Sequence, residues 1–321
     1  MIIIKKYNKS YEKSWNQFIE KSNNGTLFQT RQFLNYHINR TFNDFSLLIY
    51  HHKTLIAVLP GVKIIKNKTN FFHSHPGTSY GGFILQKKLN FKLINEIINA
   101  IDQYLIQKKF KKIFLINSPR LYWKQPHDVL DYLLQWNQYQ IKELYISHAT
   151  NIPCDIKIDK LLSKRKRRYI VNNEQLKNFT FQKIKTNIEF QKLYKLLEQT
   201  KQKFKTTPTH SIDELMKLCK LFPNNIAIYI SKLNNEVVGG SVIFHTTKTT
   251  SLVFYNVVSE KMTEFQLSSL QLYQSIKVCK QRGSEIFDLS IVKKSRTNMA
   301  SRYEISTLAV NKYCVFVYPI F

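Results

Sequence analysis

The sequence predicts an α/β protein (α+β, mixed sheets) built from two similar units in tandem. Its 321 residues are many for one domain and suit two. Hydrophobic residues make up 43% and aromatic residues 13%, a composition that forms packed cores. Both halves show the same order of elements: two short helices, a hairpin, a third strand, a long helix and further strands. We therefore expect an internal duplication, with units 1–155 and 156–321, the second beginning with a basic helix or linker.

The first half alternates strands with amphipathic helices. Trp15, Phe18 and Ile19 share one stripe of a helix expected over residues 10–21. Residues 91–107 give the strongest helical pattern, because their isoleucines recur on one face. The other elements expected here are helices over 29–37 and 129–136, and strands over 2–7, 45–50, 55–65, 71–85, 112–117 and 141–147.

The second half carries clear signals for the starts of helices. Ser211 with Glu214 three residues later forms a capping box for one helix, and Thr263 with Gln266 forms another for a long helix ending at residue 281. The other elements expected here are a helix over 187–201 and strands over 226–233, 237–245, 251–258, 286–291 and 313–319.

Six stretches, taken in order, carry a resemblance to a known family. They are WNQFIEKSNNGTLFQTRQF (15–33), LIAVLPG (55–61), HSHPGTSYGG (73–82), LLSKRKRRYIVNNE (161–174), EVVGGSVI (236–243) and GSEIFDLS (283–290). With the order of elements they resemble the GNAT acyltransferase fold. Two such units in one chain resemble the Fem-type peptidyl transferases and the related tandem-GNAT acetyltransferases. The resemblance spans nearly the whole chain and implies an acyltransferase with two GNAT-like domains.

The resemblance also implies a donor site before the long helix of the second unit. Most GNAT enzymes hold the pyrophosphate of acetyl-CoA on a glycine-containing turn there, whereas residues 257–266 (VVSEKMTEFQ) contain no glycine. Amides at a helix start still bind phosphate, so Val257, Ser259 and Thr263 are the expected contacts. The expected donor is acetyl-CoA or another acyl-CoA. The alternative is aminoacyl-tRNA, because Fem-type enzymes that use it also lack a good turn, although the long coiled-coil arm of many of them is not visible here.

Two residues of the second unit are candidates for catalysis. Asp288 is a carboxylate in an otherwise apolar strand, so it is either a buried structural acid or a general base with a raised pKa. Tyr255 lies where the strands of a GNAT unit part and could act as a general acid toward the leaving group, or be an ordinary half-exposed tyrosine. Asn256 beside it is expected to contact the substrate.

Residues 73–82 are the most unusual segment of the first unit. Its glycines permit a close approach of the backbone to a ligand, and its imidazoles and hydroxyls could orient an amine. His75 is the candidate base, and His73, Ser79 and Tyr80 would line the acceptor. The alternative is a tight connection between strands with surface histidines. No carboxylate or cysteine lies nearby, so no metal site is expected.

The net charge of +28 is spread over the whole chain. Residues 1–150 hold 21 Lys and Arg against 8 Asp and Glu, and the remainder holds 28 against 13. This excess indicates an anionic partner, unless an AT-rich genome has enriched lysine. The densest run contains Lys164, Arg165, Arg167 and Arg168, which would contact phosphate of a nucleotide-linked substrate or of tRNA, or form a solvated linker helix.

The sequence predicts a cytoplasmic protein, with peripheral association at the inner membrane face as a further option. The first residues are too short an apolar run for a signal peptide, and no stretch approaches the roughly 20 apolar residues of a membrane span. The 4 cysteines form no CxxC pair, which argues against a zinc or disulfide framework.

Three hypotheses for function remain open. The first is an N-acyltransferase that moves an acyl group from a thioester to a primary amine, on a cell-surface sugar or peptide precursor that is small or linked to a lipid or nucleotide. Transfer would be direct, because no Cys or Ser stands in a recognisable nucleophile motif. The second changes the donor to aminoacyl-tRNA, with tRNA as a partner. The third is a non-catalytic protein that binds nucleic acid or an anionic surface.

Overall fold

The computed structural model describes residues 1–155, 157–260, 262, 266–292 and 311–319, which fall into two compact units. Unit 1 holds Met1–Ile146 together with Tyr313–Phe321, and unit 2 holds Ser147–Lys312. The chain thus enters unit 2 before residue 155, and it returns to unit 1 for strand β14. Among the described residues, no helix is long and apolar enough to cross a membrane.

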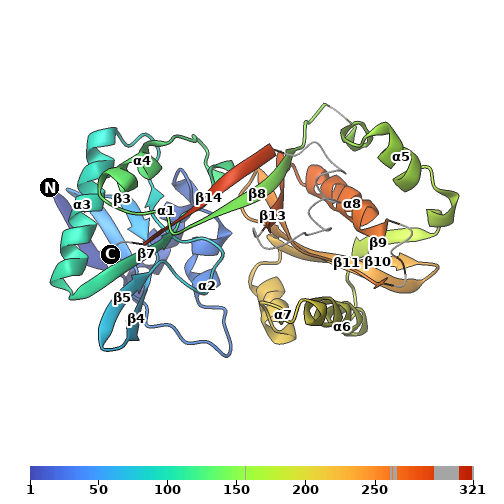
Figure 1. The fold of residues 1–321 in the computed structure, drawn as a ribbon, viewed down its shortest axis with the longest axis horizontal. Coiled ribbons are helices and arrows are strands. Elements are labelled where there is room, and N and C mark those ends of the chain that lie inside the picture. Colours follow the sequence, from blue (N-terminus) through green and yellow to red (C-terminus); the bar gives the residue numbers. More distant parts are fainter. Residues whose placement is uncertain (156, 261, 263–265, 293–310, 320–321) are drawn as a thin grey trace. The chain divides into compact units, whose positions relative to one another are not determined.

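Unit 1 contains two groups of paired strands (Figure 1). The order β1-β2-β3-β6 is antiparallel throughout, whereas in β4-β5-β7-β14 the pair β5–β7 is parallel. The bounds are Ile2–Lys6 (β1), Leu47–His51 (β2), Thr54–Leu59 (β3), Val62–Lys66 (β4), Thr69–His73 (β5), Ile84–Leu85 (β6), Phe110–Ile116 (β7) and Asn311–Pro319 (β14).

The helices of unit 1 cover these strands. They are α1 (Glu12–Lys21), α2 (Arg31–Leu34), α3 (Phe91–Gln107) and α4 (Val129–Trp136). The helix expected over 91–107 is confirmed, and its isoleucine face is buried in the core. The helix expected over 29–37 is shorter, because residues 27–29 form a separate 3-10 turn before α2.

The strand expected over 55–65 is divided into β3 and β4 at Pro60 and Gly61. A Cβ atom on Gly61 would lie 2.1 Å from the ring of Phe72, so only glycine fits beneath that ring. The strand region expected over 71–85 is also divided: β5 ends at His73, and regular pairing resumes only at β6.

Unit 2 is one mixed sheet with helices on both faces (Figure 1). The strand order within it is β8-β13-β12-β11-β10-β9. Helices α6 and α7 pack on one face, while α8 packs on the other against β11 and β12. The bounds are Glu143–Asn151 (β8), Lys164–Ile170 (α5), Phe179–Lys183 (β9), Asn187–Lys203 (α6), Ile212–Leu221 (α7), Ile226–Leu233 (β10), Glu236–His245 (β11), Thr250–Val258 (β12), Leu267–Gln281 (α8) and Ile286–Val292 (β13).

One of the two expected capping boxes is confirmed. Ser211 and Glu214 cap α7 reciprocally through their side chains and backbone amides. Thr263 lies outside the described residues. Helix α8 begins at Leu267, after Gln266, which has a left-handed backbone and makes no side-chain cap.

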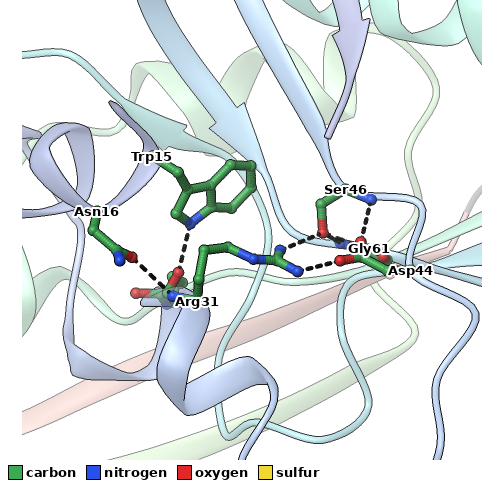
Figure 2. Close-up of polar contacts among 7 residues, drawn as sticks. Trp15, Asn16, Arg31, Asp44, Ser46 and Gly61 are labelled. Carbon is green, nitrogen blue, oxygen red and sulfur yellow. Dashed lines mark hydrogen bonds and ion pairs between the residues drawn. The ribbon is translucent and has the colours of Figure 1, made fainter. Parts of the chain in front are cut away.

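A buried ion pair between Arg31 and Asp44 joins α2 to the segment that enters β2 (Figure 2). The Arg31 side chain is 1% exposed, and its guanidinium carbon lies 3.7 Å from the ring centroid of Tyr7. Ser46 extends the cluster, since its hydroxyl accepts hydrogen bonds from Arg31 Nη1 at 3.2 Å and from the Gly61 amide at 3.1 Å. The start of α2, the entry to β2 and the β3–β4 break are thereby held together.

Removing the charge of Asp44 should destabilise unit 1 more than removing that of Arg31. Asp44→Ala leaves a buried guanidinium without its counter-charge and should lower the free energy of unfolding by about 3–5 kcal/mol. Arg31→Met keeps much of the packing on Tyr7 and leaves a carboxylate that is 30% exposed and can be hydrated, so about 1–2 kcal/mol is expected. Urea unfolding of the single and double variants measures both losses, and equal losses would contradict this account of the pair.

Candidate functional site

Strands β12 and β13 of unit 2 part after a short stretch of parallel pairing. Within the described residues the register joins Thr250 to Ile286, Ser251 to Phe287 and Leu252 to Asp288. Strand β12 then continues to Val258 and β13 to Val292, and the described residues of the two strands show no further register pair. The edge of β12 beyond Leu252 can therefore offer peptide N–H and C=O groups to a ligand in an extended conformation.

Asp288 lies at the point where the two strands part, and its side chain is fully buried. Its Oδ1 accepts hydrogen bonds from the Ser147 hydroxyl and from the Ser290 amide, both at 2.8 Å. Ser290 has a φ of +75°, so the backbone of β13 changes direction just after the aspartate. These contacts suit the structural alternative for Asp288, and its role as a general base stays a prediction.

Tyr255 faces the helices α6 and α7. Its hydroxyl lies 3.0 Å from the Thr209 amide, 3.3 Å from the His210 amide and 3.1 Å from His210 Nδ1. Burial raises the pKa of Tyr255 above its usual value. The hydroxyl therefore stays protonated near neutral pH and ties the start of α7 to β12.

Asn256 points to the opposite face, because successive side chains of a strand alternate. Its Oδ1 accepts from the Ser241 hydroxyl at 3.0 Å, and its Nδ2 donates to Ser268 Oγ at 3.1 Å. Gln271 of α8 also donates to Asn256 and, at 2.8 Å, to the Gly240 carbonyl. The structure thus separates Tyr255 and Asn256, which the sequence had suggested would face one cleft.

Sequence reasoning missed Gln271 as the centre of this network. Its side chain is buried, and its Oε1 accepts from the Ser231 hydroxyl at 2.6 Å. The sequence did contain a signal: LSSLQLYQS in α8 has many polar residues for a helix that packs on a sheet. Such residues indicate buried hydrogen bonds. The network bonds α8 to β10, β11 and β12 beside the diverging strands.

The three expected donor contacts lie in different surroundings. Val257 is buried and lines a small apolar space under α6. Ser259 borders a groove of about 560 Å³ together with Lys192, Lys195 and other residues of α6. Its amide already donates to the Val238 carbonyl at 2.8 Å, so that amide is not free to cradle phosphate. Thr263 falls outside the described residues.

The basic run forms α5, which Ser163 caps through the Lys166 amide. Lys166 Nζ donates to Gln266 Oε1 at 2.7 Å and so connects α5 to the residue before α8. Arg167 Nε donates to the Asp159 carbonyl at 3.1 Å. The cations of α5 that stay exposed are Lys164, Arg165 and Arg168.

In unit 1, residues 74–82 follow β5 and lie beside β7 beyond the last register pair, which joins His73 to Phe114. The Ser74 hydroxyl accepts from the Ile116 amide at 2.7 Å, and the Gly81 amide donates to the Ile116 carbonyl at 2.8 Å. Both backbone groups of Ile116 are thus satisfied by the connecting loop. In the described part of unit 2, the edge of β12 that faces β13 is unpaired beyond Leu252. In unit 1 the corresponding edge of β7 is paired with the loop that follows β5.

The loop residues predicted to bind the acceptor differ in exposure. His75 is buried against Phe42, and burial lowers its pKa to about 3. Tyr80 is buried with its ring against Phe28 and Tyr122. His73 and Ser79 are half-buried, and burial lowers the pKa of His73. Both imidazoles are therefore neutral near pH 7, and His73 and Ser79 are the more accessible pair.

No metal site is evident in the described part of the chain, where no three His, Cys, Asp or Glu side chains gather closely enough to hold an ion. The predicted catalytic residues lie in separate units, Asp288 and Tyr255 in unit 2 and His75 in unit 1.

No family model matches this sequence, and no curated protein matches it. Solved structures nevertheless share its fold. The crystal structure of FemX gives a TM-score of 0.72 at 10% identity, covering 98% of this chain and 96% of that one. A tandem GNAT protein from the clavulanic acid biosynthesis pathway gives 0.58 at 6%, covering 100% and 98%. L-PGS from Bacillus licheniformis gives 0.57 at 12%, covering 97% and 91%. The chain therefore has a tandem GNAT fold of the Fem type, as the sequence resemblance implied.

Two substitutions at Asp288 test its structural role. Asp288→Asn keeps an oxygen that can accept from Ser147 and Ser290, so its free energy of unfolding should stay within about 1 kcal/mol of the parent. Asp288→Ala leaves both donors without this acceptor and should cost about 1–3 kcal/mol. Urea unfolding measures the difference, and an alanine variant as stable as the parent would contradict the structural role.

Proposed function

We propose that the chain transfers an acyl group from an activated donor to a primary amine, and that the donor binds in unit 2 along β12. The observation that carries this proposal is the parting of β12 from β13 at Leu252 and Asp288, in a chain with a tandem GNAT fold. An extended donor arm can pair with the free edge of β12 as an added strand would. The acceptor would be an amine on a sugar or peptide precursor of the cell surface.

The residues around the end of β12 fit an anionic donor held by side chains. Lys192, Lys195 and Glu236 border the groove beside Ser259, so its charged side chains sum to one net positive charge. The Ser259 amide is already bonded to Val238. Lysine ammonium groups bind phosphate without needing a glycine-containing turn. Acetyl-CoA or another acyl-CoA would supply the thioester acyl group, and Lys192, Lys195 and Ser259 would hold its anionic part.

The loop residues of unit 1 stay predicted contacts of the acceptor. His73 is neutral at pH 7 and half-buried, so it can accept a hydrogen bond or a proton from an ammonium group. Ser79 is the second accessible group of the loop. His75 and Tyr80 are buried and would keep the loop in position, while general-base roles for His75 and Asp288 and an acid role for Tyr255 stay predictions. We expect direct transfer, without a covalent enzyme intermediate. The catalytic residues then have to position and deprotonate the amine.

Aminoacyl-tRNA is the second candidate donor, and α5 is the observation that favours it. Lys164, Arg165 and Arg168 are exposed, and the same helix contacts Gln266 at the approach to α8 through Lys166. A row of exposed cations near a donor site suits the phosphates of a nucleic acid.

A thermal-shift series with acetyl-CoA, CoA and charged tRNA tests the donor class. An acyl-CoA donor should raise the melting temperature, and Lys192→Ala with Lys195→Ala should weaken its binding by about tenfold. Lys217→Ala with Lys220→Ala removes the same charge from α7 and should leave binding unchanged. A lack of response to both CoA species would exclude this donor.

The salt dependence of tRNA binding tests the alternative. If α5 contacts tRNA, replacing Lys164, Arg165 and Arg168 by glutamine should reduce the slope of log K against log salt by about 2 to 3. Filter binding at several salt concentrations gives the slope. An unchanged slope would show that α5 does not contact the phosphates.

A further inference from the structure

An exposed row of aromatic side chains lies on α3 and α4 of unit 1, the helices labelled in Figure 1. Phe91 begins α3, and Tyr132 and Trp136 lie one turn apart on α4. The ring centroids of Phe91 and Tyr132 are 6.1 Å apart, as are those of Tyr132 and Trp136. These three residues, which we call the aromatic patch, therefore form one continuous surface.

The aromatic patch faces water to an unusual degree. Phe91 is 53% exposed, Tyr132 52% and Trp136 65%, whereas Trp15 and Trp123 are 0% and 8% exposed. The opposite faces of both helices already bury their aliphatic side chains in the core. The patch is therefore not needed to build the core, and a contiguous apolar surface of this kind marks an interaction site.

Lysines flank Phe91 in the sequence at the N-terminal end of α3. Lys87, Lys88 and Lys92 are all exposed, and the first turn of α3 contains no acidic residue. Cations are disfavoured at this end of a helix, where the dipole is positive. An anionic surface that covers the patch would relieve this repulsion.

Acidic residues also lie near the patch, and one arginine offsets them only in part. Asp128 and Asp131 of the α4 start both form ion pairs with Arg120. Glu96 is half-buried and lies one turn beyond Lys92. The four cations of the rim, counted with Arg120, exceed its three carboxylates by one, and the first 150 residues carry 21 basic against 8 acidic side chains.

We propose that the aromatic patch docks the protein onto the surface of an anionic lipid bilayer. Aromatic rings are stabilised at the level of the lipid head groups, and flanking lysines are attracted to anionic lipid phosphates. Self-association through the same patch is disfavoured, since a two-fold contact would bring two sets of Lys87, Lys88 and Lys92 together.

Tryptophan fluorescence of the full chain provides a direct test. The sequence contains 3 tryptophans, and Trp136 is the exposed one. Vesicles of phosphatidylglycerol mixed with phosphatidylcholine should shift the emission to shorter wavelength and protect it from an aqueous quencher. Vesicles of phosphatidylcholine alone should do neither. No binding to the anionic vesicles at low salt would overturn the proposal.

Variants then test whether the patch itself makes the contact, with vesicle co-sedimentation as the readout. Trp136→Ser alone, and Phe91→Ser with Tyr132→Ser, should each weaken partitioning by about tenfold. Phe204→Ser removes a side chain that is 64% exposed in unit 2 and should have no effect. Equal partitioning of the patch and control variants would overturn the proposal.

A charge-matched pair of variants tests the lysines. Replacing Lys87, Lys88 and Lys92 by glutamine should reduce binding by about a hundredfold, because each lysine near an anionic surface contributes about a factor of five. Replacing Lys66, Lys68 and Lys111 by glutamine removes the same charge elsewhere in unit 1 and should change binding much less. Equal losses from both sets, or a dimer in solution that Trp136→Ser abolishes while vesicle binding persists, would contradict a specific docking surface.

Discussion

A strand that leaves its neighbour must find other partners for its peptide groups, and this constraint organises both units. In unit 2 the pairing of β12 with β13 stops at Leu252 and Asp288, and Asp288 secures the turn in β13 by bonding Ser147 and Ser290. In unit 1 the loop 74–82 satisfies both backbone groups of Ile116. The same order of elements thus leaves, among the described residues, an unpaired edge on β12 in unit 2 and a paired edge on β7 in unit 1.

The proposed division of roles between the two units rests on this difference. An open edge accepts an extended ligand through main-chain bonds that do not depend on side-chain identity. A closed edge presents loop side chains, here the half-buried His73 and Ser79. The Arg31–Asp44 pair lies near this loop, and its two charges shift the pKa of His75 in opposite directions, Asp44 upward and Arg31 downward.

The sequence predicted those features that depend only on residues close together in the chain. The apolar face of α3 and the capping box of α7 were readable because each depends on residues within a few positions. The opposite orientations of Tyr255 and Asn256 were readable from the alternation of the expected strand over 251–258 and were missed. The buried state of His75 and the partner of Arg31 depend on segments distant in sequence. The pattern of β12 did not indicate that His210 would contact Tyr255 or that Gln271 would contact Asn256. The sequence therefore predicted the fold better than the candidate site.

The return of β14 to unit 1 has a consequence for how the chain acquires its structure. Val317 pairs with Ile116, so one sheet of unit 1 is completed by residues separated by the whole of unit 2. Contacts of such long sequence separation form slowly, because a large loop must close first. During synthesis unit 2 can fold as an independent insertion, while β7 keeps an unpaired edge until residues 317–319 emerge. Unit 1 begins first along the chain and is finished last.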